Sequence, residues 1–134
     1  HDAPPALPVP VDAAGKPLTA IKIDPDSCQV ELIQVEPDEV AHVLRSARTT
    51  TMEFKRGNCL VMDDGSFTAD HPSRFHFKGD ALKRPFFGPV LVLGLVNSNW
   101  ASTTMPVKGV RDSIIWEQWD PALKRYGAAA LELA

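Results

Sequence analysis

The sequence predicts an α+β fold, a single domain with a mixed or antiparallel sheet of about five to seven strands and two main helices. Three observations predict it. Short segments alternate apolar and polar residues around turn residues, as β-hairpins do. An apolar run at 86–96 has no alternation, which is typical of a central strand covered on both faces. Helix start patterns open residues 37–48 and 121–133, which we expect to cover the faces of the sheet.

Length and composition predict the domain organisation. A chain of 134 residues is usually one domain and can bury a core without disulfide support. Five of the twelve prolines lie in residues 1–17, where they favour an extended path. We therefore expect a flexible arm at 1–17 and one α+β domain at 18–134. The net charge of −3 lacks the basic excess that would make nucleic acid the default partner.

The first elements are a hairpin and a helix. Ile21 and Ile23 share one face of a strand, turn residues follow at 24–27, and alternation resumes from Cys28. Residues 37–48 then begin with Pro and acidic side chains, which suit the positive end of a helix dipole. Their apolar side chains recur at helical spacing, so we expect this helix to face the core.

A second hairpin and an aromatic strand follow. Residues 52–55 alternate, a Gly-Asn pair turns the chain at 57–58, and a strand returns at 59–62. Phe75 and Phe77 then alternate with basic residues, which predicts a strand with a buried aromatic face and a basic solvent face.

The last third contains four expected elements. The central strand at 86–96 is followed by a short helix at 106–112 and by an alternating strand at 113–119. An Asp-Pro pair then repeats a helix start, which predicts a terminal helix at 121–133, broken at Gly127.

The two cysteines bear on the compartment. Cys28 and Cys59 lie in strand-like runs and are too few for a disulfide framework or a structural zinc site. We expect two buried thiols; the alternative is one cross-strand disulfide in a secreted protein. The longest apolar run, Val90–Val96, is too short to span a bilayer. We therefore expect a soluble, cytoplasmic protein without membrane contact.

Five motifs follow one another along the chain: AIKIDPDSCQV (20–30), LVMDDGSF (60–67), FHFKG (75–79), FGPVLVLG (87–94) and ASTTMPVKGVRDSIIW (101–116). Taken in this order, they resemble a small domain family of unknown function encoded mainly by phages, plasmids and other mobile elements. The resemblance covers about residues 18–119; the Pro-rich arm and the loop around Trp100 depart from the pattern. It implies a fold and an origin, and it brings no assigned chemistry.

A basic group of residues is the candidate ligand-binding site. It lies on the strand face and in the loop that follows, close in sequence to aromatic residues, and contains Arg74, His76, Lys78, Lys83 and Arg84. Cations beside an aromatic ring can bind phosphates and stack bases, which fits a nucleotide or single-stranded nucleic acid. The alternative is a solvated charged strand face, because the alternation turns the two phenylalanines away from the cations.

An acidic and histidine group is the candidate for metal binding or acid–base chemistry, and contains Asp63, Asp64, Asp70, His71 and His76. The preferred interpretation is structural, because Asp-Asp-Gly-Ser and Asp-His-Pro are sequences that tight turns require. No phosphate loop, nucleophile elbow or zinc-binding helix motif is present in the sequence. We therefore expect no cofactor and no resident metal, and a binding protein rather than an enzyme.

Trp116 and Trp119 are candidate interface residues. They fall on opposite faces of a regular strand, so one of them should be exposed or covered by a helix or a partner chain. A homodimer and a monomer are equally expected on this ground.

The function predicted first is a non-enzymatic binding or interaction protein of a mobile genetic element that acts on host machinery, with a host or element-encoded protein as partner. The second is a nucleic-acid- or nucleotide-binding domain that uses the basic strand face. The third is a metal-dependent or acid–base enzyme.

Overall fold

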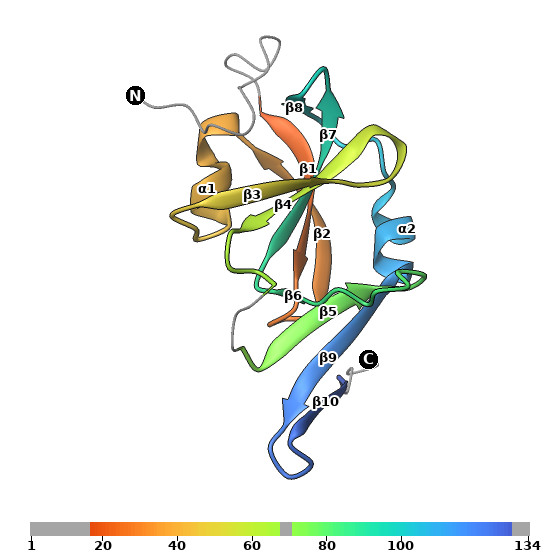
Figure 1. Ribbon diagram of the computed structural model, residues 1–134. Helices are drawn as coiled ribbons and strands as arrows, with labels where there is room; N and C mark the ends of the chain where they lie inside the picture. Colours follow the sequence, from red (N-terminus) through yellow and green to blue (C-terminus); the bar gives the residue numbers. More distant parts are fainter. Residues whose placement is uncertain (1–16, 68–70, 130–134) are drawn as a thin grey trace.

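A computed structural model describes residues 17–67 and 71–129, which form two antiparallel sheets (Figure 1). The first sheet has the order β2-β1-β7-β4-β3, with β8 also paired to β7. Its strands are β1 (Leu18–Asp24), β2 (Gln29–Val35), β3 (Thr49–Glu53), β4 (Asn58–Asp63), β7 (Val90–Val96) and β8 (Asn99–Ala101). The second sheet has the order β10-β9-β5-β6. Its strands are β5 (Ser73–Phe77), β6 (Phe86–Phe87), β9 (Ile114–Asp120) and β10 (Arg125–Ala128).

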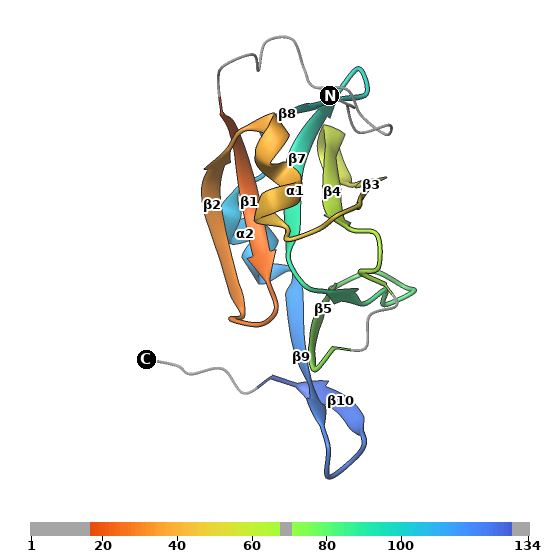
Figure 2. The same ribbon diagram turned by 90° about the vertical axis from the view of Figure 1, so that its left-hand side faces the viewer.

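Helical structure is short. The segments are the 3-10 turns η2 (Pro37–Glu39) and η3 (Lys55–Gly57) and the helices α1 (Val40–Val43) and α2 (Val107–Asp112). Figure 2, which views the molecule from the α1 side, shows α1 in front of the first sheet and α2 behind it. In the described part of the chain, no helix has the length and apolar character needed to cross a membrane.

One face of the first sheet packs against the α1 segment. Leu91 and Leu93 of the central strand β7 lie in a core that also contains Val40, Leu44 and Trp100. We call it the helix-side core. All five of these side chains are at most 2% exposed, so the short α1 segment is long enough to close this face.

The other face packs against the second sheet and α2. Val90 and Val92 of β7 point into this sheet-side core, together with Phe75, Phe86 and Val110. Because β7 is buried on both faces, successive side chains are all apolar, and the lack of alternation in its sequence is explained. The prediction of a central strand is confirmed for residues 90–96.

The run at 86–96 is nevertheless two strands and not one. Gly88 has a φ of +80°, and Pro89 follows it, so the chain turns between β6 and β7. The two strands belong to different sheets. Glycine adopts this left-handed conformation without steric cost. One apolar run therefore supplies strands to both sheets.

The predicted α+β class with one sheet and two main helices is wrong. The described residues are mostly sheet, with 48% strand against 15% helix, and the ten strands among them form sheets of six and four strands. The predicted helix at 37–48 ends at Val43 with Leu44 as its cap, because Arg45 has a φ of +53° and the amide of Ser46 donates a hydrogen bond to the carbonyl of Ala41 (2.9 Å). Ala47, one of the apolar side chains at helical spacing in this predicted helix, is exposed.

The predicted helix at 121–133 is a hairpin as far as the structure describes it, to residue 129. The Asp120 carboxylate accepts hydrogen bonds from the amides of Ala122 (2.9 Å) and Leu123 (3.3 Å). This is the local bond that an aspartate makes in a turn as readily as at a helix start. Lys124 then takes a φ of +53°, and β10 pairs with β9.

Other predicted elements are confirmed. Both hairpins form, as β1 with β2 and β3 with β4. The short helix at 106–112 is α2, and the strand at 113–119 is β9. The prediction that Cys28 lies in a strand is wrong, because this residue lies in the turn before β2 with a φ of +54°. The predicted arm at 1–17 lies outside the described residues except for Pro17.

Candidate functional site

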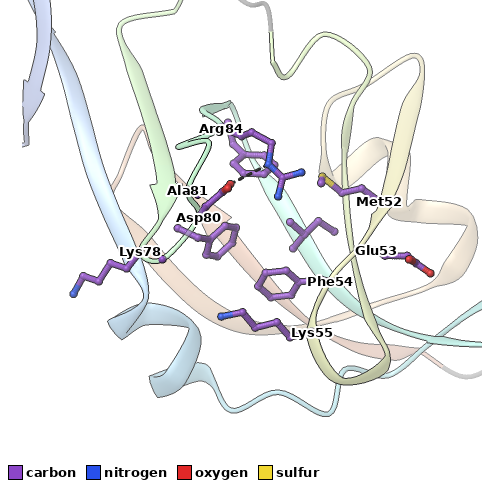
Figure 3. A pocket seen from close by; sticks show the side chains of 12 residues that line it. Met52, Glu53, Phe54, Lys55, Lys78, Asp80, Ala81 and Arg84 are labelled. Atoms are coloured by element: carbon purple, nitrogen blue, oxygen red, sulfur yellow. Dashed lines mark hydrogen bonds and ion pairs between the residues drawn. The ribbon is translucent and has the colours of Figure 1, made fainter.

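A cavity of about 450 Å³ lies between the end of β3 and the loop that follows β5 (Figure 3). Its apolar lining comes from both sheets and contains Met52, Phe54, Leu60, Phe77 and Phe86. Its polar lining contains Glu53, Lys55, Lys78, Asp80 and Arg84, with Gly79 and Ala81 completing the wall. We call it the inter-sheet pocket. Figure 3 shows the Phe54 ring, in this view, between the side chains of Arg84 and Lys55.

The η3 turn positions one wall of the inter-sheet pocket. Arg56 and Gly57 both have positive φ, so the chain reverses tightly, and the amide of Phe54 bonds the carbonyl of Asn58 (2.9 Å). The Asn58 side chain is 1% exposed and donates to the carbonyls of Lys55 and Arg56, each at 3.1 Å. The turn is thereby fixed, and the Phe54 ring packs 4.9 Å from that of Phe77.

The loop 79–84 forms the opposite wall. The Asp80 carboxylate accepts hydrogen bonds from the Leu82 amide (3.1 Å) and from Arg84 Nε (2.9 Å). The side-chain hydrogen bond from Arg84 is the largest of the causes that hold the pKa of Asp80 below its usual value. Arg84 is thus partly neutralised. Lys55 and Lys78 form no ion pair with another residue in the described part of the chain.

The five predicted ligand residues do not form one surface. Lys78 and Arg84 line the inter-sheet pocket. Lys83 is exposed and is not part of the lining. Arg74 and His76 lie on β5, where Glu117 of the neighbouring strand β9 approaches both, Arg74 Nε at 2.8 Å and His76 Nδ1 at 3.5 Å.

The predicted basic solvent face of β5 is therefore wrong in part. His76 is only 9% exposed, and the Arg74 guanidinium lies 3.8 Å from the centre of the Tyr126 ring. Glu117 and Tyr126 come from β9 and β10, strands that the sequence did not place beside β5. The Glu117 carboxylate and the Tyr126 ring both contact Arg74, whose charge the alternation pattern assigned to solvent.

Four lining residues at 52–55 were missed by the sequence reasoning, which treated them only as a hairpin strand. Phe54 and Lys55 are the important ones, because they pair an aromatic ring with a cation directly before the tight turn at 57–58. This Phe-Lys pair was the feature of the sequence from which a binding site could have been predicted. In the structure, Lys55 Nζ lies 5.9 Å from the centre of the Phe54 ring.

The side chains of the acidic and histidine group do not meet at one site. Asp63 accepts from Ser46 Oγ (2.5 Å) and from the Gly65 amide (2.8 Å), and Asp64 accepts from Thr50 Oγ1 (2.6 Å). These bonds confirm the structural interpretation of the Asp-Asp-Gly-Ser turn. His71 lies instead near Asp26 (3.6 Å), and Asp70 is outside the described residues. Among residues 17–67 and 71–129, no cluster of three or more such side chains could hold a metal ion.

The two candidate interface tryptophans differ in exposure. Trp116 packs against the sheet-side core, with its ring 5.9 Å from that of Phe75. Trp119 is 43% exposed and packs edge-on to Tyr126 at 5.2 Å. Trp119 is therefore the part of the predicted interface that remains accessible.

Both cysteines are free thiols. Cys59 is fully buried in β4, and this burial raises the pKa of its thiol to about 12, against a smaller opposing effect of a backbone hydrogen bond at Leu93. Cys28 is half-buried; burial, followed by the charges of Asp24 and Asp26, raises the pKa of its thiol.

We expect a thiol reagent such as iodoacetamide at pH 8 to label Cys28 and to leave Cys59 unmodified in the native protein. A pKa of about 12 leaves roughly one Cys59 thiol in 10⁴ ionised at this pH, and only the thiolate reacts. Salt should speed the labelling of Cys28, because it screens the two aspartates. Peptide mass mapping checks this, with labelling of both cysteines in denaturant as control; rapid native labelling of Cys59 would contradict it.

The inter-sheet pocket combines an aromatic floor with two unpaired lysines in the described residues, so it can bind a ligand that carries an apolar or planar group beside an anion. Its described lining contains no hydroxyl, thiol or imidazole group. No family model, no curated protein and no solved structure matches this chain.

Proposed function

We propose that this is a non-enzymatic binding protein, and that its inter-sheet pocket takes an acidic segment of a partner protein with an aromatic or aliphatic anchor. The observation that carries the proposal is the pairing of Phe54 and Phe77 in the floor with Lys55 and Lys78 at the wall. The anchor removes apolar surface from water, and a carboxylate beside it accepts hydrogen bonds from the lysines. Arg84 keeps Asp80 as its partner and shapes the wall.

The resemblance of the five motifs to a mobile-element family supports the biological part of this proposal. On that ground the protein belongs to a phage or plasmid, works in the cytoplasm, and binds a host or element-encoded protein. The lining carries Lys55, Lys78 and Arg84 against the carboxylates of Glu53 and Asp80, and this excess of positive charge favours an acidic partner segment.

A nucleotide or a single-stranded nucleic acid is the second candidate ligand, and the same pocket favours it. A base can stack on an aromatic ring, and phosphates can accept hydrogen bonds from Lys55 and Lys78. The site for this function is the inter-sheet pocket and not the β5 face, where Glu117 already forms an ion pair with Arg74 and lies 3.5 Å from His76 Nδ1.

We expect the double charge reversal Lys55→Glu and Lys78→Glu to weaken ligand binding at least about tenfold, because two charge-assisted hydrogen bonds are lost and replaced by repulsion. The matched control is Lys83→Glu with Lys124→Glu, which changes the net charge equally at exposed positions outside the pocket. Defined probes at low salt are a fluorescent peptide with Asp and Glu around one Phe, ATP, and a thymidine oligonucleotide, followed by fluorescence anisotropy or calorimetry.

The three probes separate the outcomes. Binding of the peptide that the pocket reversal abolishes and the control preserves supports the first proposal. The same pattern with ATP or the oligonucleotide supports the second. Equal losses in both variants would assign binding to overall charge, and no binding of any probe at low salt, where anion contacts are strongest, would overturn both.

A further inference from the structure

A second, smaller cleft of about 250 Å³ lies at the β9–β10 hairpin and is lined by His71, Pro72, Trp119 and Tyr126. Figure 1 shows this hairpin at the lower end of the view, away from α1. We call it the aromatic cleft. It shares no lining residue with the inter-sheet pocket. An exposed Trp at its wall is apolar surface that the described residues leave open to solvent.

The Tyr126 ring is held rigidly in this cleft. It is the cross-strand partner of Trp119, the Arg74 guanidinium lies 3.8 Å from the ring centre, and Phe87 packs edge-on at 6.0 Å. Its hydroxyl donates a hydrogen bond to the carbonyl of His71. Because four contacts already fix this ring, it loses little conformational entropy when a ligand binds, and this favours binding even in a shallow cleft.

A Trp and a Tyr on neighbouring strands form the kind of surface that binds polyproline segments. Such grooves hold prolines against flat aromatic faces, and the polyproline conformation has little entropy to lose. This chain carries a suitable segment of its own, the sequence APPALPVP at residues 3–10.

We propose that the proline-rich segment 3–10 of this same chain binds in the aromatic cleft. The connecting length permits it. The cleft is near the far end of β1 from Leu18, because His71 lies 3.6 Å from Asp26, just beyond that end. The seven residues of β1 span about 23 Å. Seven residues, the number from 11 to 17, span about 22 Å when extended as polyproline, a length that allows residues 3–10 to reach the level of the cleft.

Charge favours the same arrangement. Asp2 and Asp12 flank the proline-rich segment, and the exposed Lys124 and Arg125 lie on the hairpin that carries the cleft. The affinity need not be high, because a tether of this length gives an effective concentration in the millimolar range. The segment occupies the cleft if the free peptide binds with a Kd below about 1 mM.

The test uses the full chain and the indole N–H signals of its three tryptophans in NMR spectra. In one variant Pro4, Pro5, Pro8 and Pro10 are all changed to Ser; the control is Pro17→Ser, an exposed position outside the segment. Trp119→Phe assigns the Trp119 signal. We expect the Trp119 signal to shift in the four-proline variant, while the signals of Trp100 and Trp116 stay unchanged. In the Pro17→Ser control, the Trp119 signal should stay unchanged as well. A synthetic peptide of residues 1–17 should restore the signal, with a Kd below about 1 mM.

Each other outcome overturns the proposal. An unchanged Trp119 signal in the four-proline variant, with no response to the peptide, shows that the segment does not bind. An unchanged signal with a response to the peptide assigns the cleft to a proline-rich partner. A signal that depends on protein concentration, together with a doubled mass in light scattering, assigns the segment to a second copy of the chain. None of these readouts involves the pocket lysines, so the proposed function is tested separately.

Discussion

Phe75→Ala should lower the free energy of unfolding by about 3–5 kcal/mol, the usual cost of removing a buried aromatic side chain. Phe75 is fully buried, stacks on Phe86 at 5.1 Å with an interplanar angle of 17°, and touches the rings of Phe77 and Trp116. The change therefore leaves a cavity where the second sheet packs on β7. Because typical domains are stable by only 5–15 kcal/mol, this loss is a large part of the total. Urea denaturation followed by circular dichroism measures it.

Leu82→Ala is the matched control for this prediction. It removes a large apolar side chain that is 78% exposed, so its cost should stay within about 0.5 kcal/mol. A Phe75→Ala cost below about 1 kcal/mol would mean that the two sheets do not share a packed core.

Gly94→Ala should destabilise the protein by about 1–3 kcal/mol although it adds only one methyl group. A Cβ at this position would meet the backbone oxygen of Ser102 at 2.4 Å, a contact that no side-chain rotation can relieve. The segment that has to move is bonded to β1, through the Thr19 amide to Ser102 Oγ (2.9 Å) and the Thr103 amide to the Thr19 carbonyl (2.8 Å). Thermal and urea unfolding measure the loss.

Gly127→Ala provides the comparison within the same fold. Gly127 lies in strand β10, a Cβ there meets nothing within 4 Å, and its φ is not positive. We expect a change of at most about 0.5 kcal/mol. Equal losses at the two glycines would show that the contact with Ser102 does not decide the cost.

Only part of the candidate site could be predicted from the sequence. Lys78 and Arg84 were identified from a basic segment, and both line the inter-sheet pocket. Phe54 and Lys55 lie more than twenty residues earlier in the chain, and only the tertiary structure, in which the Phe54 ring packs 4.9 Å from that of Phe77, brings them to the same cavity. Arg74 and His76 were predicted with the pocket residues, yet Glu117 holds them elsewhere. The partner of a charge depends on which strands are neighbours, and periodicity within one strand carries no information about that.

The sequence by itself determined the elements with local causes: the two hairpins, the short helix α2, strand β9 and the buried strand β7. In each, turn residues, apolar periodicity or an uninterrupted apolar run acts over a few residues. The tertiary structure alone decided how these elements combine. The Asp120-Pro121 start suits a helix or a turn equally well by local bonding, and pairing of β10 with β9 selects the turn. Gly88 likewise divides one apolar run between two sheets, because burial on both faces of β7 requires a second layer that only distant strands supply.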